Sequence, residues 1–402
     1  MSLLKILQSR GVTLLAPESV YIAPDVNPER IASSVTLYPG CRLSGAALSI
    51  GPNCVVGAEA PATVVDCQLG RQVHLAGGYF ERATFLDGFK AGSGAHVRPA
   101  CLFEEASSLA HTVGVKQTLL MPWVTAGSLI NFCDCLMAGG TGRHNHSEIG
   151  SSYIHFNFTP HQDKATASLI GDVPHGVLLN QPAIFLGGQG GLVGPCRIAF
   201  GTVIPAGQVW RGDVTTPGNL VAKPMFHKAI NTPYAPSQFH GLGRIIQNNL
   251  LYIGNLLALD AWYRIVRAPF MCGNPFSAAC HTGARQRLDE MLNERIARFD
   301  DLAQRVARSL KQDLTRTQPS EHQCFVDAWP VCYETLQQAL AQRASEPIPA
   351  AVQTLVTQLP STDYLKTIQS LQAEDVRTLT SWLEGFPTRM GAKYGQMKQS
   401  SR

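Results

Sequence analysis

The amino-acid sequence predicts two fold classes in succession: a left-handed parallel β-helix over residues 1–224 and an all-α domain over residues 225–402. Three observations support this prediction. Aliphatic residues recur every six positions in the first half, turn-forming residues collect between them, and long amphipathic stretches replace both patterns beyond about residue 221. A chain of 402 residues also exceeds one ordinary hydrophobic core, so at least two domains are expected.

The six-residue repeat is the strongest of these signals. It fits neither the 3.6-residue period of an α-helix nor long strand alternation, but it fits short strands on the faces of a three-sided prism. One residue per repeat then points inward, and a second, often small, residue stands four places later. The expected inward residues are Phe85, Ala91, Val97, Phe103, Leu109, Val115 and Met121, with Ile31, Leu37 and Leu43 before them and Leu186, Leu192, Ile198 and Ile204 after them.

Glycine, proline and asparagine mark the expected corners of the prism, as in Ile50-Gly51-Pro52-Asn53. These residues supply the positive or fixed φ that tight corners require. The repeat is interrupted over residues 127–185, which contain Gly139-Gly140-Thr141-Gly142 and a histidine-rich stretch, and it resumes at Ile149-Gly150 and Ile170-Gly171-Asp172. We expect these residues to leave the prism as loops, and such insertions often form the binding surface of a solenoid.

The second half of the chain reads as helices after Val221-Ala222-Lys223-Pro224. Residues 241–268 predict a mostly buried helix, and apolar residues at steps of three, four and seven predict further ones. These stripes are interpreted as the core of a helical bundle. They comprise Leu288, Leu292, Ile296, Phe299, Val306 and Leu310; then Phe325, Trp329, Cys332, Leu336 and Leu340; then the segments around Ile368 and Trp382.

Charge and cysteine content exclude several classes of function. The formal net charge of +4 is not gathered into basic runs, so neither nucleic acid nor an anionic membrane is an expected partner. The sequence has no apolar stretch long enough to span a membrane and no signal peptide, which predicts a cytoplasmic protein. The 11 cysteines are scattered and are expected to be reduced and buried. Cys133 and Cys135 form only a C-x-C, which gives a structural metal little support.

From Gly11-Val12-Thr13-Leu14 to about Asp213, the chain resembles the acetyltransferase half of the bacterial bifunctional enzymes that make UDP-N-acetylglucosamine from glucosamine 1-phosphate. The uridyltransferase half of that family has no counterpart in this sequence. The resemblance implies a homotrimer that binds a sugar phosphate or nucleotide sugar, with acetyl-coenzyme A as acyl donor, in clefts between neighbouring prisms. It rests on Val97-Arg98-Pro99, on Lys116, and on Ile149-Gly150 through Phe156-Asn157-Phe158, and it implies an acceptor site made of Arg98, Lys116, Asn131, Asn157 and Lys164.

The chain departs from this family at the catalytic base, because Ser128 stands where the family has its histidine. Asn131 likewise replaces a tyrosine and Glu148 an asparagine. A serine hydroxyl cannot by itself take a proton from an amine at neutral pH. The nearby histidines could replace the base, bind a divalent metal with Glu148 or Asp163, or simply lie in solvent. Candidate bases are His144 and His146, with His155 and His161 close by in sequence.

Arg98 and Lys116 also have a case independent of the resemblance. Each follows an inward-pointing residue and so projects outward, which makes them either a phosphate contact or simple surface charge. Two hypotheses follow. The chain is an acyltransferase acting on a sugar phosphate or nucleotide sugar, with Ser128, His144 or His146 in the catalytic site. Alternatively, it is a non-catalytic descendant that binds a sugar nucleotide or a protein.

Overall fold

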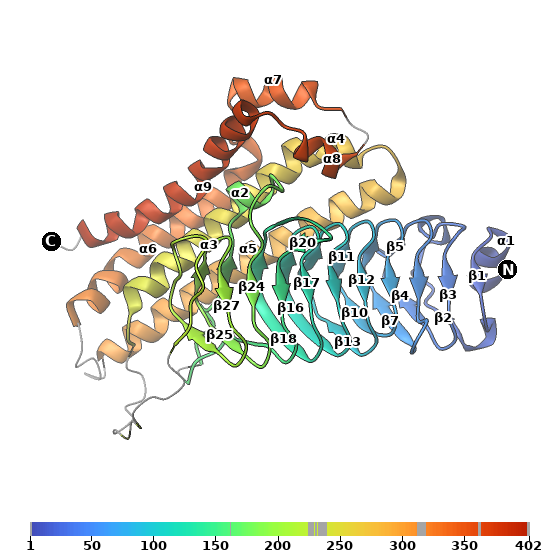
Figure 1. Cartoon of the computed structure of the whole chain (residues 1–402), viewed down its shortest axis with the longest axis horizontal. Helices are drawn as coiled ribbons and strands as arrows, with labels where there is room; N and C mark the ends of the chain where they lie inside the picture. The colour runs from blue at the N-terminus through green and yellow to red at the C-terminus, as the bar shows by residue number, and fades with distance from the viewer. Residues whose placement is uncertain are drawn as a thin grey trace.

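The computed structural model describes residues 2–160, 162–223, 229, 231, 239–311, 319–360 and 363–399. After a short helix, α1 (Leu3–Ser9), the chain winds into parallel coils that follow one another along the long axis of the molecule (Figure 1). The predicted left-handed parallel β-helix is confirmed, and so is the helical region after it. The predicted domain boundary at residues 224 and 225 lies outside the described residues.

Each coil contributes strands to three faces. Face 1 consists of β1 (Thr13–Leu14), β3 (Thr36–Leu37), β6 (Val55–Val56), β9 (His74–Leu75), β12 (Lys90–Ala91), β15 (Ser108–Leu109), β17 (Thr125–Ala126), β21 (Glu148–Ile149), β24 (Phe185–Leu186) and β27 (Val203–Ile204). Face 2 consists of β2 (Tyr21–Ile22), β4 (Arg42–Ser44), β7 (Ala62–Val65), β10 (Gly78–Glu81), β13 (Ala95–Val97), β22 (Ile154–Phe156), β25 (Gly191–Val193) and β28 (Val209–Arg211).

Face 3 consists of β5 (Ser49–Ile50), β8 (Gln68–Leu69), β11 (Ala83–Phe85), β14 (Cys101–Phe103), β23 (Ser168–Ile170) and β26 (Arg197–Ile198). The long strands β16 (Val113–Leu120) and β18 (Ile130–Met137) run from face 2 into face 3. They turn the corner at Gln117 and Asp134, whose φ angles are +52° and +59°. A short hairpin of β19 (Gly140–Gly142) and β20 (Asn145–His146) leaves the prism between faces 3 and 1.

The predicted inward residues form the core of the prism. Phe85, Val97 and Leu109 are at most 3% exposed, and the rings of Phe85 and Phe103 stack with centroids 5.3 Å apart. The expectation that residues 127–185 leave the prism as loops is wrong for β18 and β22, which are part of it, whereas β21 and β23 contain Ile149 and Ile170, where the repeat was expected to resume. Val113 pairs with Ile130, 17 positions later, so this coil is one residue short of three six-residue repeats and the sequence period slips.

The helical region confirms the predicted stripes, and residues 241–268 form α3, a π-helical turn and the start of α4. Its elements are α3 (Leu242–Trp262), the π-helical turn η3 (Tyr263–Arg267), α4 (Ala268–Met271), α5 (Pro275–Lys311), α6 (Pro319–Gln342), α7 (Ala350–Gln358), α8 (Tyr364–Gln369) and α9 (Ala373–Gln399). None of the helices in the described part of the chain is long and apolar enough to cross a membrane. All 11 cysteines are free, and most are buried as predicted.

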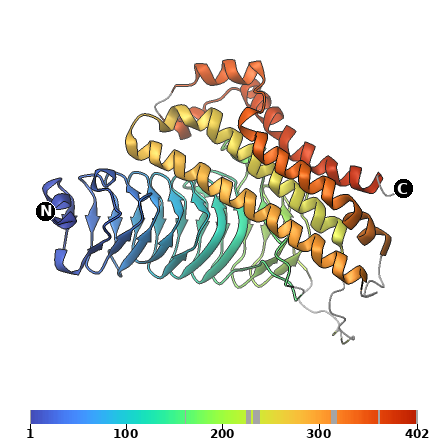
Figure 2. The same ribbon diagram turned by 180° about the vertical axis from the view of Figure 1, so that it is seen from behind.

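The helices lie along face 3 of the β-helix, where α5 crosses β5, β8, β11 and β14 (Figure 2). The approach is close, since a Cβ atom on Gly283 would overlap side-chain oxygens of Gln68 and Thr84. The π-helical turn adds two buried contacts at the corner between faces 3 and 1. Tyr263 donates to Glu104 at 2.6 Å, and Arg267 pairs with Glu105 at 2.6 Å. The helices and the coils therefore share one continuous hydrophobic core.

Candidate functional site

The outward side chains of face 2 form two columns across neighbouring coils. In the first column, Tyr79 pairs with His96, His96 with Gly114, and Gly114 with Asn131. In the second, Arg98 follows Val97, and because Val97 pairs with Val115, Arg98 lies beside Lys116. The parallel register thus brings the two predicted phosphate-binding residues together.

A cavity of about 700 Å³ opens over these columns at the corner between faces 2 and 3. Arg82, Arg98 and Lys116 line it with positive charge. Glu81 and Glu294 contribute carboxylates, and Glu294 comes from α5 in the helical region. His96 lines the same cavity, two residues before Arg98 on β13.

Gly114 leaves open space in the first column, between His96 and Asn131. A Cβ atom built at this glycine would meet nothing nearer than the carbonyl oxygen of Ile130, 3.9 Å away. The exposed side chains of His96 and Asn131 therefore border a gap in the outer wall, with Arg98 and Lys116 along its edge. A ligand group can enter here without moving the backbone.

Hydrogen bonds hold the basic corner in place. The Nη2 atom of Arg98 donates to Cys133 Sγ at 3.1 Å, and burial raises the pKa of this thiol to about 11, so the sulfur remains a neutral thiol. Glu294 accepts a hydrogen bond from Arg298 at 2.9 Å. Tyr79 donates to Glu81 at 3.2 Å. Among the described cations that line the cavity, Arg98 and Lys116 are half-buried and Arg82 is exposed, so an anionic ligand inside it would meet Arg98 and Lys116 first.

The other predicted acceptor residues lie on the same side of the prism. Asn131 is exposed on face 2, and its Oδ1 atom accepts from Cys133 at 3.3 Å. Asn157 donates to Asp134 at 2.5 Å at the corner between faces 2 and 3. The carbonyl of Lys164 accepts from Arg295 of α5 at 3.3 Å, while its side chain is exposed. The structure thus places the five acceptor residues on face 2 or at its edge with face 3.

Ser128 lies at the opposite edge of face 2, where face 1 ends. Its backbone N–H donates to Ser151 Oγ at 3.1 Å. His111 occupies the equivalent corner position one coil earlier. The N–H of Leu129 donates to the carbonyl of His111, just as the N–H of Ser152, one coil later, donates to the carbonyl of Ser128. A histidine therefore borders this edge, one coil away from Ser128.

Within the described residues, none of the predicted histidine bases reaches the outer surface of face 2. His144 and His146 belong to the β19–β20 hairpin between faces 3 and 1, where His146 Nδ1 bonds to the carbonyl of Arg143 at 2.9 Å. His155 points into the core, between the carbonyl of Cys133 at 2.7 Å and Ser168 Oγ at 2.8 Å. His161 lies outside the described residues.

A metal site involving these histidines has no support in the described ranges. Among those residues, no three histidine, cysteine, aspartate or glutamate side chains are grouped so that they could hold a metal ion. On this side of the molecule, the cavity and the gap at Gly114 are therefore the candidate places for a ligand.

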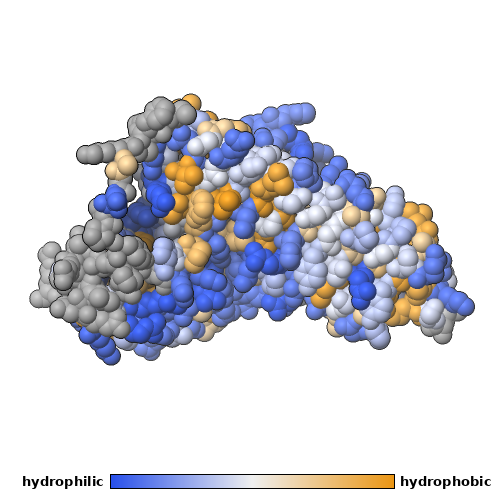
Figure 3. All heavy atoms as spheres, turned by 90° about the horizontal axis from the view of Figure 1, so that it is seen from below, coloured by the Kyte–Doolittle hydropathy of each residue, from blue (hydrophilic) through white to orange (hydrophobic). Residues whose placement is uncertain are grey.

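Reasoning from the sequence missed His96, Arg82 and Glu294. A signal for His96 was present, because residues two apart on a strand share a face and His96 stands two before Arg98. Glu294 carried no such signal, since only the packing of α5 on the coils brings it to the cavity. Ile154 and Phe156 are exposed further along face 2. In the view from below, hydrophobic side chains gather near the middle of the molecule (Figure 3).

Fold and site together define a parallel β-helix protein with a basic, histidine-containing cavity on one face. No protein-family model matches the chain. The Bifunctional protein GlmU of Thermus thermophilus is 31% identical over 189 residues, which are 47% of this chain and 37% of that protein. The Bifunctional protein GlmU of Thermotoga maritima is 27% identical over 209 residues, 52% of this chain and 41% of that protein. That of Trichlorobacter lovleyi is 27% identical over 214 residues, 53% and 41%. The chain thus spans about two fifths of the length of these curated relatives, and the predicted resemblance is confirmed over about half of this chain.

Proposed function

We propose that face 2 binds the phosphate of an amino-sugar phosphate or nucleotide sugar and presents the sugar for acetyl transfer. The observation that supports this most directly is the in-register placement of Arg98 beside Lys116 on the wall of a cavity of about 700 Å³. Two half-buried cations on adjacent coils can share the oxygens of one phosphate group. The similarity to GlmU proteins over about half of the chain points to the same class of ligand.

His96 is the proposed general base, because it lines the cavity that holds Arg98 and Lys116. In the proposed step, the acceptor amine attacks the thioester carbonyl of acetyl-coenzyme A. The new N–C bond forms as the C–S bond breaks, His96 takes the proton from nitrogen, and coenzyme A leaves as the thiolate. Asn131, across the gap at Gly114, can hydrogen-bond the sugar ring.

Isothermal titration calorimetry with glucosamine 1-phosphate and UDP-N-acetylglucosamine tests the binding site. Arg98→Met and Lys116→Met should each weaken binding by about tenfold or more, because each removes a charge-assisted hydrogen bond. Lys90→Met is the matched control, since Lys90 is exposed on face 1, and it should bind like the unaltered protein. Unchanged binding in both cavity variants would refute the site.

Release of free thiol from acetyl-coenzyme A tests the chemistry with glucosamine 1-phosphate, which carries the free amine that the step requires. His96→Gln should abolish turnover while binding persists, whereas His146→Gln should retain both. Loss of turnover in His146→Gln alone would place the base in the hairpin instead. His111→Gln examines the remaining edge of face 2 in the same assay.

The second candidate function is sugar-nucleotide or protein binding without turnover. It is favoured by Ser128, which stands where the resembled family has its base. Ligand binding that depends on Arg98, together with no thiol release from any acceptor, would select this function. The resemblance also implies a homotrimer, and light scattering should then give three times the 43.5 kDa of one chain. A monomer mass would reject this assembly.

A further inference from the structure

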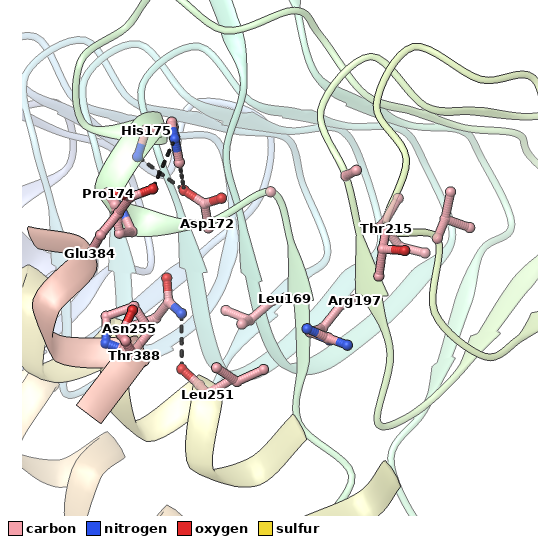
Figure 4. A pocket seen from close by; sticks show the side chains of 15 residues that line it. Leu169, Asp172, Pro174, His175, Arg197, Thr215, Leu251, Asn255, Glu384 and Thr388 are labelled. Carbon is pink, nitrogen blue, oxygen red and sulfur yellow. Dashed lines mark hydrogen bonds and ion pairs between the residues drawn. The ribbon is translucent and has the colours of Figure 1, made fainter. Parts of the chain in front are cut away.

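A second cavity, of about 440 Å³, lies where the last coils meet the helical region. Its walls come from β23 and β26 of the prism, from the short helix α2 (Val173–Gly176), and from α3 and α9. Figure 4 shows His175 and Asp172 at one end and Arg197 and Thr215 at the other. The volume falls within the range of small-molecule sites, about 300–1,000 Å³.

The charged groups in this wall already have partners. His175 lies between two carboxylates, 2.8 Å from Asp172 and 3.5 Å from Glu384. Arg197 pairs with Asp213 at 3.2 Å. Arg197 is thus neutralised by Asp213, and two carboxylates share one imidazole at the other end, so an anionic ligand would meet no uncompensated positive charge and would lose its hydration without a matching gain.

Hydrogen-bonding capacity remains in the same wall. Within the described residues, the Nε atom of Arg197 is buried and has no partner. The two oxygens of each carboxylate can accept more bonds than His175 supplies, and the hydroxyls of Thr215 and Thr388 can donate and accept. Such mixed donors and acceptors suit hydroxyl groups, which do both.

An apolar floor completes the cavity. Leu169 and Leu251 lie between the two polar ends (Figure 4), and Ile198 also lines the cavity. A sugar ring has this combination of properties, with C–H groups on its faces and hydroxyls around its rim. We propose that the cavity binds a neutral sugar of one or two rings, separately from the site on face 2.

Binding here has a structural consequence, because the walls come from both parts of the chain. Leu169 and Ile198 belong to the coils, whereas Leu251 and Thr388 belong to α3 and α9. A ligand between them stabilises the contact by mass action, so the melting temperature should rise with ligand concentration.

Saturation-transfer NMR on the full chain tests the proposal with glucose, N-acetylglucosamine and maltose as uncharged probes. Glucuronate and glucose 6-phosphate are the charged counterparts, both of them anions. Thr388→Phe and Thr215→Phe fill the cavity from opposite walls, and both positions are exposed, so folding should persist. Each should weaken binding of the uncharged probes by about tenfold or more. The matched control Thr354→Phe, at an exposed position on α7, should leave binding unchanged.

Arg98→Met separates this site from face 2, since it should leave the uncharged probes bound. The proposal is overturned if no uncharged probe gives saturation transfer, if the charged probes bind more tightly, or if both cavity-filling variants bind normally. Loss of uncharged-probe binding in Arg98→Met would also overturn it, because the signal would then come from face 2.

Discussion

His155 and His175 have pKa values displaced in opposite directions because their surroundings differ. His155 is 2% exposed inside the prism, and burial lowers its pKa to about 4. His175 belongs to α2 and is partly exposed beside Glu384 of α9, and the hydrogen bond to Asp172 raises its pKa. The folded protein therefore keeps His155 neutral in mild acid, while it favours the charged form of His175.

The buried His155 should make the fold sensitive to acid. As the pH falls from 6.5 to about 4, His155 binds a proton in the unfolded chain but stays neutral in the folded chain. The free energy of unfolding should therefore decrease by about 3 kcal/mol over this interval. Urea unfolding at several pH values measures this loss. His155→Gln should flatten the profile over this interval. Parallel profiles for the two proteins would contradict the prediction.

His175 should act in the other direction. Its raised pKa means that stabilisation is complete below about pH 6.5 and is lost as the pH rises through the folded-state value. Thermal melts of His175→Gln and the unaltered protein should therefore differ most in mild acid and converge in alkaline buffer. A difference that grows with pH would show that the ion pairs to Asp172 and Glu384 do not stabilise the fold.

Individual residues show what the sequence could reveal of the site. Arg98 and Lys116 were predicted because both follow an inward residue within an unbroken stretch of the repeat. His144 and His146 were predicted because they stand in the histidine-rich insertion, but an insertion in the repeat does not tell which corner of the prism it leaves from. In the structure these histidines stand at the corner between faces 3 and 1, away from Ser128.

At the level of elements, the contact between α5 and face 3 depends on a close backbone approach. Gly283 faces Gln68 and Thr84, which hydrogen-bond to each other at 2.9 Å in the β-helix. Any side chain at this position must push the helix away from the coils. The contact is therefore sensitive to a single methyl group.

Gly283→Ala should destabilise the protein by about 1–3 kcal/mol, the usual cost of overpacking. Gly395→Ala is the matched control, because nothing lies within 4 Å of the added Cβ and alanine favours a helix. Chemical denaturation should show a loss for the first and no loss for the second. Equal stabilities would mean that α5 can shift without cost.

The same contact explains why the sequence did not predict where the helices pack. Gln68 and Thr84 look like ordinary surface residues between inward aliphatic ones, yet they are at most 2% exposed beneath α5. The repeat predicts which side chains point inward, because the prism interior excludes polar groups. It carries little information about which outer face is covered, since the residues beneath α5 include polar side chains such as Gln68 and Thr84.

In the whole molecule, the first coil is the least supported part of the β-helix. β1 and β2 stand at the ends of their sheets, and the coils that α5 contacts begin with β5. Because each coil depends on its neighbours, hydrogen exchange followed by mass spectrometry should show faster exchange in β1 and β2 than in β13 and β16. Uniform protection along the axis would contradict this expectation.

The length of α5 has a mechanical consequence. Its 37 residues span about 55 Å, and the helix is anchored on the coils from β5 to β14 and again by the 2.7 Å ion pair between Arg295 and Asp134. A stack of coils alone can bend along its axis, but the long helix α5, attached along one side, resists that bending. The spacing between the coils of Arg98 and Lys116 is therefore held constant, and a phosphate group meets two charges at a preset separation.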